Sequence, residues 1–262
     1  MNKRKITKHI GILCAMPEEI GSTIDNLKNV ETKSYGDLKI YSGDWCFLNS
    51  TLKSFNVHLS IAWSGWGKVS AARAATRLIS HQFNNLKIDA IFFTGVAGAI
   101  NSKLKQWDII ISHELVQHDM DARPLFAKYE IPALKKVRIK SHKLITDWTL
   151  NSLKNSKQDG SLENFGNLYK GLIATGDKFI SKKNDFENIL KDMEDLFAVE
   201  MEGAAVAQVA KQEKVPFQII RVISDGANEN SSADFNKFLL NYKHQSAKLI
   251  SSLMENIQSL PI

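Results

Sequence analysis

The feature that most constrains the fold is a series of short apolar runs that alternate with helical or turn patterns. The runs are IGILCAM, IDAIFFTGVAGAI, WDIIISHELVQHD, GNLYKGLIATGDKFI, LFAVEME and FQIIRVISD. Strands that are apolar on both faces are typical of a mainly parallel sheet covered by helices on its two sides. The chain is therefore predicted to form a single α/β domain over residues 1–262, with a mainly parallel mixed central sheet flanked by helices.

Helical patterns occupy the segments between several of these runs. A helix is expected to open at Pro17, because the missing N–H of proline is no loss at a first helical position. Further helices are expected at residues 67–83 and 203–212. A long amphipathic helix is predicted to close the chain at residues 232–258.

The composition favours a globular protein without nucleic-acid or membrane partners. The net charge is +6, but the basic residues are scattered, without an aromatic–basic recognition pattern beside them. The apolar stretch near the start is too short for a signal peptide, and no run reaches the ~18 apolar residues of a membrane helix. Cys14 and Cys46 lack metal-ligand spacing and are expected to be buried thiols. A reducing, cytoplasmic location is therefore expected.

Ligands of open α/β sheets bind at the carboxyl ends of the strands. In this chain that rule selects the segments MPEE, TGVAG, TGDKFI, VEME and ISDGAN. Glu200 and Glu202 are two residues apart in an extended segment, so their side chains are expected to point the same way. Two interpretations are open: the pair caps the following helix, or it accepts hydrogen bonds from the hydroxyls of a sugar diol.

Glu19 and Asp225 are the candidate acid–base residues. Glu19, like Glu18, lies in the first turn of an expected helix, where the helix dipole also favours an acid. Asp225 follows a buried strand, four residues after Arg221, and is either a turn residue before Gly226 or a general acid. Either carboxyl, held beside a bound base or water, could move a proton.

Common cofactor and nucleophile motifs are missing from the sequence. The TGVAG turn has neither GxGxxG spacing nor a P-loop lysine, and there is no GxSxG elbow. The HDMD segment, His118 to Asp121, has no second cluster of His or Cys to complete a metal site. Phe179 and Phe235 could stack on a heterocycle. The sequence thus predicts acid–base chemistry on a small molecule with no metal and no cofactor.

Six segments together resemble one known superfamily. AMPEE, SGWGKV, TGVAG, TGDKFI, VEMEGAA and RVISDGAN occur in the order found in the nucleoside phosphorylase/hydrolase superfamily, from about Ile10 to the last helix. Within it, the chain is most similar to the 5′-methylthioadenosine/S-adenosylhomocysteine nucleosidases. The resemblance implies the fold of that superfamily and a pocket for an adenine nucleoside.

The resemblance also implies a role for each matching position. Glu19 would activate the attacking water, Asp225 would protonate N7 of adenine, and Glu202 would hold the ribose hydroxyls. The other implied substrate-binding positions are Trp66, Val96, Ala97, Gly98, Phe179, Ile180, Glu200, Met201, Arg221, Ser224 and Phe235. Val96 stands where many relatives have serine, and Trp66 stands where a smaller aliphatic residue is common.

The implied reaction is hydrolysis of the N-glycosidic bond of 5′-methylthioadenosine, S-adenosylhomocysteine and related 5′-substituted adenosines, releasing adenine and the substituted ribose. Three alternatives stay open: a purine nucleoside phosphorylase or an aminodeoxyfutalosine hydrolase of the same fold, and a non-catalytic nucleoside-binding or adhesion protein. A carboxylate rather than an arginine at the first turn favours water over phosphate. A homodimer is expected, in which a loop near Leu125 to Pro132 lines the partner's site.

Overall fold

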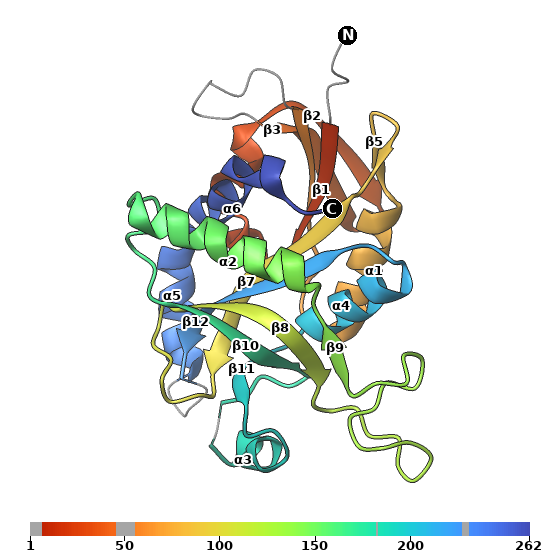
Figure 1. Cartoon of the computed structure of the whole chain (residues 1–262), viewed down its shortest axis with the longest axis vertical. Coiled ribbons are helices and arrows are strands. Elements are labelled where there is room, and N and C mark those ends of the chain that lie inside the picture. Colours follow the sequence, from red (N-terminus) through yellow and green to blue (C-terminus); the bar gives the residue numbers. More distant parts are fainter. Residues whose placement is uncertain (1–6, 46–55, 182, 227–230) are drawn as a thin grey trace.

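The computed structural model describes residues 7–45, 56–181, 183–226 and 231–262. Its centre is a ten-stranded sheet with the strand order β11-β10-β8-β12-β7-β1-β4-β3-β2, in which β9 pairs with β8 (Figure 1). These strands are β1 Thr7–Cys14, β2 Leu27–Tyr35, β3 Leu38–Trp45, β4 Asn56–Trp63, β7 Ala90–Ala99, β8 Ile109–Gln117, β9 Arg138–Lys140, β10 Leu168–Thr175, β11 Leu196–Glu200 and β12 Phe217–Asp225. The short strands β5 Gln82–Phe83 and β6 Leu86–Lys87 form a separate hairpin.

Parallel pairing dominates the middle of the sheet. β1 runs parallel to β4 and β7, β12 runs parallel to β7, and β10 runs parallel to β8 and β11. β12 is antiparallel to β8, and β11 is antiparallel to β7. Because β11 pairs with both β10 and β7, the strands β7, β12, β8, β10 and β11 close into a ring. The predicted mainly parallel mixed sheet is confirmed.

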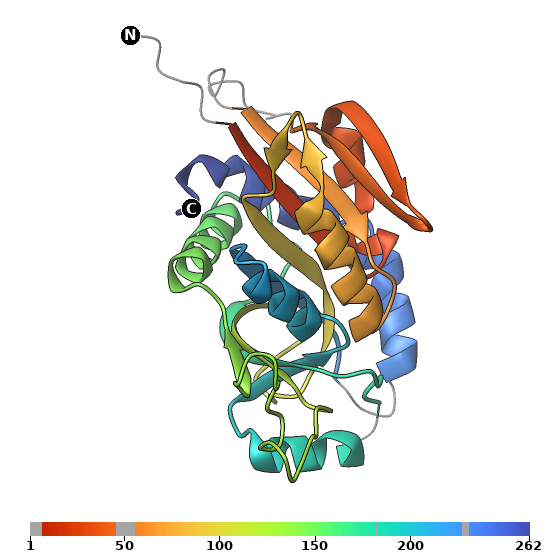
Figure 2. The ribbon, with the colours of Figure 1, turned by 90° about the vertical axis from the view of Figure 1, so that its right-hand side faces the viewer.

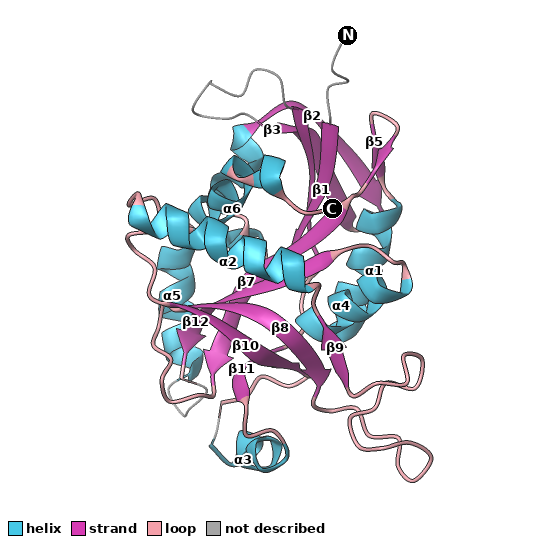
Figure 3. Cartoon of the chain, in the orientation of Figure 1, coloured by secondary structure: helices cyan, strands magenta, loops and turns pink. Residues whose placement is uncertain are grey.

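Helices cover both faces of this sheet, as the colouring in Figure 3 makes clear. α1 (Lys68–Ser80) and α4 (Gly203–Gln212) pack together on one face (Figure 2). α2 (Lys143–Gln158), α5 (Ser231–Tyr242) and α6 (Ser246–Glu255) share an apolar layer on the other face. Two apolar layers around one sheet explain why a central strand such as β7 is buried along most of its length, whereas the edge strand β2 is largely exposed.

α3 (Lys183–Asp192) lies between β10 and β11, and a short 3-10 helix, η4 (Ile257–Ser259), follows α6. The helix expected to open at Pro17 is not an α-helix. The chain forms only a 3-10 turn there, η1, which ends at Glu19, and a second 3-10 segment, η2 (Gly21–Asn26), follows it.

The long C-terminal helix is broken, since α5 ends at Tyr242 and α6 begins at Ser246. The break lets the junction pack on the first strand's turn, where the Ser246 hydroxyl donates to the Glu18 carbonyl oxygen (3.0 Å). Amphipathic spacing on both sides of the break conceals it in the sequence, because periodicity reports the buried face and not the bend.

In the described ranges, no helix is long and apolar enough to cross a membrane. Nor do those residues include a group of three or more His, Cys, Asp or Glu side chains that could hold a metal ion. Cys14 is a buried free thiol, as expected, whereas Cys46 lies outside the described residues.

Candidate active site

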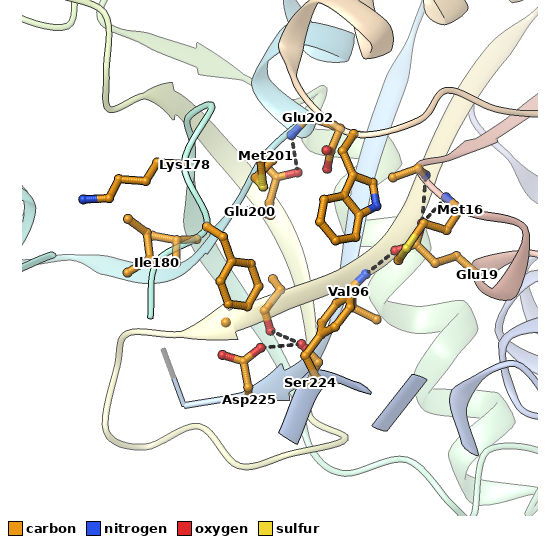
Figure 4. Close-up of a pocket in the computed structure, with 17 residues that line it drawn as sticks. Met16, Glu19, Val96, Lys178, Ile180, Glu200, Met201, Glu202, Ser224 and Asp225 are labelled. Atoms are coloured by element: carbon orange, nitrogen blue, oxygen red, sulfur yellow. Dashed lines mark hydrogen bonds between the residues drawn. The ribbon is translucent and has the colours of Figure 1, made fainter. Parts of the chain in front are cut away.

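The carboxyl ends of β1, β7, β11 and β12 surround one pocket. It contains about 560 Å³ of space not filled by protein, its open mouth included. Figure 4 shows Glu19, Glu202 and Asp225 approaching it from three different sides. The lining residues are Ala15, Met16, Glu19, Trp66, Val96, Ala97, Gly98, Lys178, Phe179, Ile180, Val199, Glu200, Met201, Glu202, Ser224, Asp225 and Phe235.

Glu19 is a buried carboxyl held by backbone donors. Its Oε2 accepts hydrogen bonds from the N–H groups of Ala15 (2.8 Å) and Met16 (3.0 Å), and its Oε1 accepts one from Val96 (2.9 Å). Burial raises the pKa of Glu19, and the charge of Arg221 and the three N–H groups oppose that rise. A carboxyl with a raised pKa is suited to take a proton near neutral pH.

Glu200, the last residue of β11, is engaged by the protein itself. Its Oε1 accepts a hydrogen bond from the Thr175 hydroxyl. Its Oε2 accepts bonds from the N–H groups of Glu202 (3.1 Å) and Gly203 (2.6 Å) and from Nη2 of Arg221 (2.5 Å). These bonds satisfy the N-terminus of α4, where a carboxylate is favoured. Glu200 therefore lines the pocket but is the capping carboxyl of the pair.

Glu202 stands one residue before α4 and has few protein donors. Its Oε1 accepts a hydrogen bond from the N–H of Gly67 (2.8 Å), the residue before α1. Its Oε2 lies 4.0 Å from Nη2 of Arg221 and makes no hydrogen bond to a described residue. Burial, followed by the neighbouring charge of Glu200, raises the pKa of Glu202 to about 8. Oε2 is thus the carboxyl oxygen best placed to meet ligand hydroxyls.

Arg221 lies beneath the pocket wall and does not line the pocket. It is 1% exposed, pairs with Glu200 and stacks over the ring of Phe93, 4.1 Å from Cζ to the centroid. A Cβ on Gly95 would lie 2.5 Å from both Nη1 of Arg221 and Oε1 of Glu19, so glycine leaves the room that these groups need. Arg221 was expected in the substrate-binding set, and in the structure its guanidinium is turned toward the buried carboxyls of Glu200 and Glu202.

Asp225 is aimed into the pocket by an irregularity at the end of β12. The register with β7 shifts between Ile223 and Asp225, so Ser224 is an extra residue in the ladder. Bulges of this kind re-aim side chains beside functional sites. The Ser224 hydroxyl donates to Oδ2 of Asp225 (2.7 Å) and so orients a carboxyl that is itself buried.

Aromatic side chains form the remaining wall. The ring of Phe235 on α5 meets Phe179 edge-on at 5.9 Å and Trp66 edge-on at 6.0 Å. Ile180 is buried beside them, whereas Trp66 is 53% exposed. The arrangement offers apolar faces to a flat heterocycle, with Trp66 at the solvent side of the wall.

All expected site residues other than Arg221 line this pocket. Sequence reasoning did not single out Ala15, Met16, Lys178 and Val199, which line it too. Ala15 and Met16 act through backbone N–H groups, which no side-chain pattern reveals. The only signal for them is their place directly before PEE in the AMPEE segment.

The segment expected to reach a partner lies outside the pocket lining. Leu125 is 83% exposed and Phe126 is 39% exposed, while Pro132 is half-buried. Six residues before Leu125, Asp119 pairs with Nζ of Lys68 on α1 (2.5 Å). The chain is thus held to α1 shortly before the segment that exposes Leu125 and Phe126 to solvent.

Known proteins share this architecture over nearly the whole chain. Residues 9–255 match the family model described as the phosphorylase superfamily. The chain therefore belongs to the phosphorylase superfamily.

The chain is also similar to solved structures of individual enzymes. The chain is 30% identical to an S-adenosylhomocysteine nucleosidase from Streptococcus pyogenes in complex with 5-methylthiotubericidin, with 98% of each chain covered and a TM-score of 0.83. It is 29% identical to the 5′-methylthioadenosine/S-adenosylhomocysteine nucleosidase from Neisseria meningitidis in complex with methylthio-immucillin-A (95% and 99% covered, TM-score 0.81). It is also 28% identical to the futalosine hydrolase of Helicobacter pylori (95% and 97% covered, TM-score 0.79).

Proposed function

We propose that this protein hydrolyses the N-glycosidic bond of 5′-substituted adenosines such as 5′-methylthioadenosine and S-adenosylhomocysteine, releasing adenine and the substituted ribose. The observation that carries the proposal is the presence of two buried carboxyls, Glu19 and Asp225, on different sides of one pocket. Glu19 is held by three backbone N–H groups, and Asp225 is held by a serine hydroxyl. The similarity to two nucleosidases in complex with nucleoside-like compounds supports the same reaction.

The two carboxyls divide the proton transfers. Cleavage of the bond builds positive charge on the ribosyl ring and negative charge on the departing purine. Glu19 takes a proton from the attacking water, and Asp225 gives a proton to N7 of the purine. Each positioned proton transfer contributes on the order of 10²–10⁴-fold, and holding the reactants in place adds further acceleration.

The other lining residues hold the nucleoside. Oε2 of Glu202 accepts from a ribose hydroxyl, and Met201 packs against the sugar. Phe179 stacks on the purine, the backbone of Ile180 bonds its edge, and Phe235 covers it. These roles are the ones that the resemblance to the nucleosidases implies, and the presence of all these residues in the lining of one pocket supports them.

Water suits this pocket better than phosphate as the second substrate. Phosphate sites use arginine, which bonds the oxygens in bidentate geometry. Here Arg221 is 1% exposed and paired with Glu200. Lys178 also lines the pocket, but Figure 4 shows it beside Ile180 and away from Glu19. A carboxylate at the attacking side repels phosphate and activates water.

Adenine release is the direct test. The protein is assayed with 5′-methylthioadenosine, S-adenosylhomocysteine and adenosine, each with and without phosphate. We expect adenine release from the 5′-substituted nucleosides that is independent of phosphate. Release that requires phosphate and yields ribose 1-phosphate would assign a phosphorylase instead. No release from any substrate, with retained nucleoside binding, would leave a non-catalytic binder.

An aminodeoxyfutalosine hydrolase is the second candidate, favoured by the similarity to the futalosine hydrolase. The reaction breaks the same type of bond, so the same carboxyls would serve. Adding aminodeoxyfutalosine to the assay separates the two by their kcat/KM values. A value higher than that for 5′-methylthioadenosine would reverse the assignment.

We propose further that the protein works as a homodimer. The exposed apolar side chains of Leu125 and Phe126 support an interface at this segment. Sedimentation at micromolar concentration should show a dimer, and Leu125→Asp should weaken it. A fully active monomer would contradict this proposal.

A further inference from the structure

The turn that carries Glu19 rests on the junction between α5 and α6. The hydroxyl of Ser246 donates to the carbonyl oxygen of Glu18 (3.0 Å). On the other side of Glu19, a Cβ on Gly21 would lie 2.6 Å from the carbonyl oxygen of Lys243. The junction therefore touches the chain on both sides of the proposed base.

Two hydroxyl groups, one at the end of α5 and one in β7, are buried without a partner among the described residues. The side chains of Tyr242, the last residue of α5, and Thr94, in the middle of β7, are fully buried. Neither hydroxyl has a hydrogen-bond partner among the described residues. Burying such a group unpaired is costly, so in native proteins it is paired with protein or with ordered water.

The two hydroxyls lie on the same face of the sheet. The last pair of the parallel ladder between β1 and β7 is Leu13 with Phe93, and Cys14 and Thr94 directly follow this pair in their strands. Phe92 is two residues before Thr94 and so projects from the same face of β7. Phe92, Cys14 and Tyr242 belong to a single apolar cluster. Thr94 therefore points into the layer that contains Tyr242.

Titratable groups from several elements lie within electrostatic reach of Glu19. They are Arg221 from β12, Glu202 directly before α4 and the thiol of Cys14 from β1. Tyr242 from α5 is another of these groups: burial raises its pKa, and the charge of Glu19 raises it further. The phenol and the carboxyl are thus within electrostatic reach, but no direct hydrogen bond joins them.

We propose that Tyr242 is a positioning residue for Glu19, acting through one internal water that its hydroxyl shares with the hydroxyl of Thr94. Two polar groups separated by more than a hydrogen-bond distance are commonly bridged in this way. The dipole of the water, with a hydrogen directed toward the carboxylate, stabilises the ionised form of Glu19. Three acceptor positions of Glu19 are taken by backbone N–H groups, and the fourth stays open for the attacking water. The inference rests on the proposed function, in which Glu19 is the base.

The test is the pH profile of kcat/KM for three variants. Tyr242→Phe and Thr94→Val each remove one hydroxyl and keep the size of the side chain. Each should move the acidic limb to higher pH by about half a unit, with kcat/KM at high pH nearly unchanged. The double variant should move it no further, because both substitutions remove the same water. Tyr169→Phe, on β10 and packed against Phe197, is the matched control and should not shift the limb.

An unshifted acidic limb, or shifts that add in the double variant, would overturn the proposal. A crystal structure of the unaltered protein gives a second readout, which does not depend on whether the variants fold. A water within hydrogen-bond distance of both hydroxyls supports the proposal, and its absence from well-ordered density overturns it. Failure of the unaltered protein to release adenine would instead reject the proposed function, and the crystallographic readout would still decide on the water.

Discussion

Replacing Glu202 with glutamine should change how the stability of the protein depends on pH. Burial and the neighbouring Glu200 raise the pKa of Glu202 to about 8 in the folded chain, whereas a solvated glutamate titrates near about 4.3. Between these values the folded chain holds one proton more than the unfolded chain. The free energy of unfolding therefore falls as the pH rises through this window. Glutamine has no proton to lose there, so Glu202→Gln should lack this fall.

One extra bound proton corresponds to a slope of about 1.4 kcal/mol per pH unit. From about pH 5.5 to about pH 7.5, the unaltered protein should therefore lose roughly 2–3 kcal/mol relative to Glu202→Gln. The contribution is fully present below about pH 4.3 and is lost by the time the pH has passed about 8. Glu202 is buried, so solvent screening does little to reduce this value.

Urea unfolding followed by tryptophan fluorescence measures the difference at matched pH values. Glu213→Gln, at an exposed position after α4, is the control, and its difference from the unaltered protein should stay within about 0.5 kcal/mol across the range. A Glu202→Gln difference that does not change with pH would refute the reasoning. It would mean that Glu202 holds no extra proton in the folded state.

Three further predictions concern the site. Glu19→Gln should keep the fold but lower turnover by at least ~10²-fold, since the amide cannot take a proton; adenine release and circular dichroism measure the two effects. Asp225→Asn should slow release of adenine far more than release of a synthetic leaving group that departs as an anion, and equal losses would exclude the acid role. Gly95→Ala should lower both thermal stability and turnover, because its Cβ would lie 2.5 Å from Arg221 and from Glu19; an unchanged melting temperature would contradict this.

The sheet could be predicted from the sequence because its strands are buried on both faces. Residues such as Ile91 and Phe92, adjacent in β7, are both fully buried, one in each apolar layer. The antiparallel return of β11 onto β7 could not be predicted. It depends on pairing Ala198 with Ala99, and residues so far apart leave no local pattern.

The place of the site was also predictable, because it follows from the carboxyl ends of the strands. The atoms that form the contacts in the site were harder to predict. Val96 donates its backbone N–H to Glu19, so this hydrogen bond does not need the serine hydroxyl that many relatives have at this position. Arg221 matched a family motif, yet its position on β12 turns it toward the interior. Neither the hydrogen bond from the Val96 N–H nor the inward direction of the Arg221 side chain can be predicted from the sequence alone, because both depend on how the strands lie in the folded sheet.

The capping interpretation of the VEME segment fits Glu200, whereas diol binding is the role proposed for Glu202. Glu200 is still in the strand, where Thr175, Arg221 and the first N–H groups of α4 surround its carboxylate. Glu202 leaves the extended conformation, with φ −137° and ψ −36°, as the residue before α4. Both carboxyls still line the pocket, and both approach Nη2 of Arg221, Glu200 at 2.5 Å and Glu202 at 4.0 Å. Arg221 forms its hydrogen-bonded ion pair with Glu200. Glu202 is therefore left with one backbone N–H donor, and its pKa is raised. The unequal division of donors between two neighbouring carboxyls thus leaves one of them ready for a ligand.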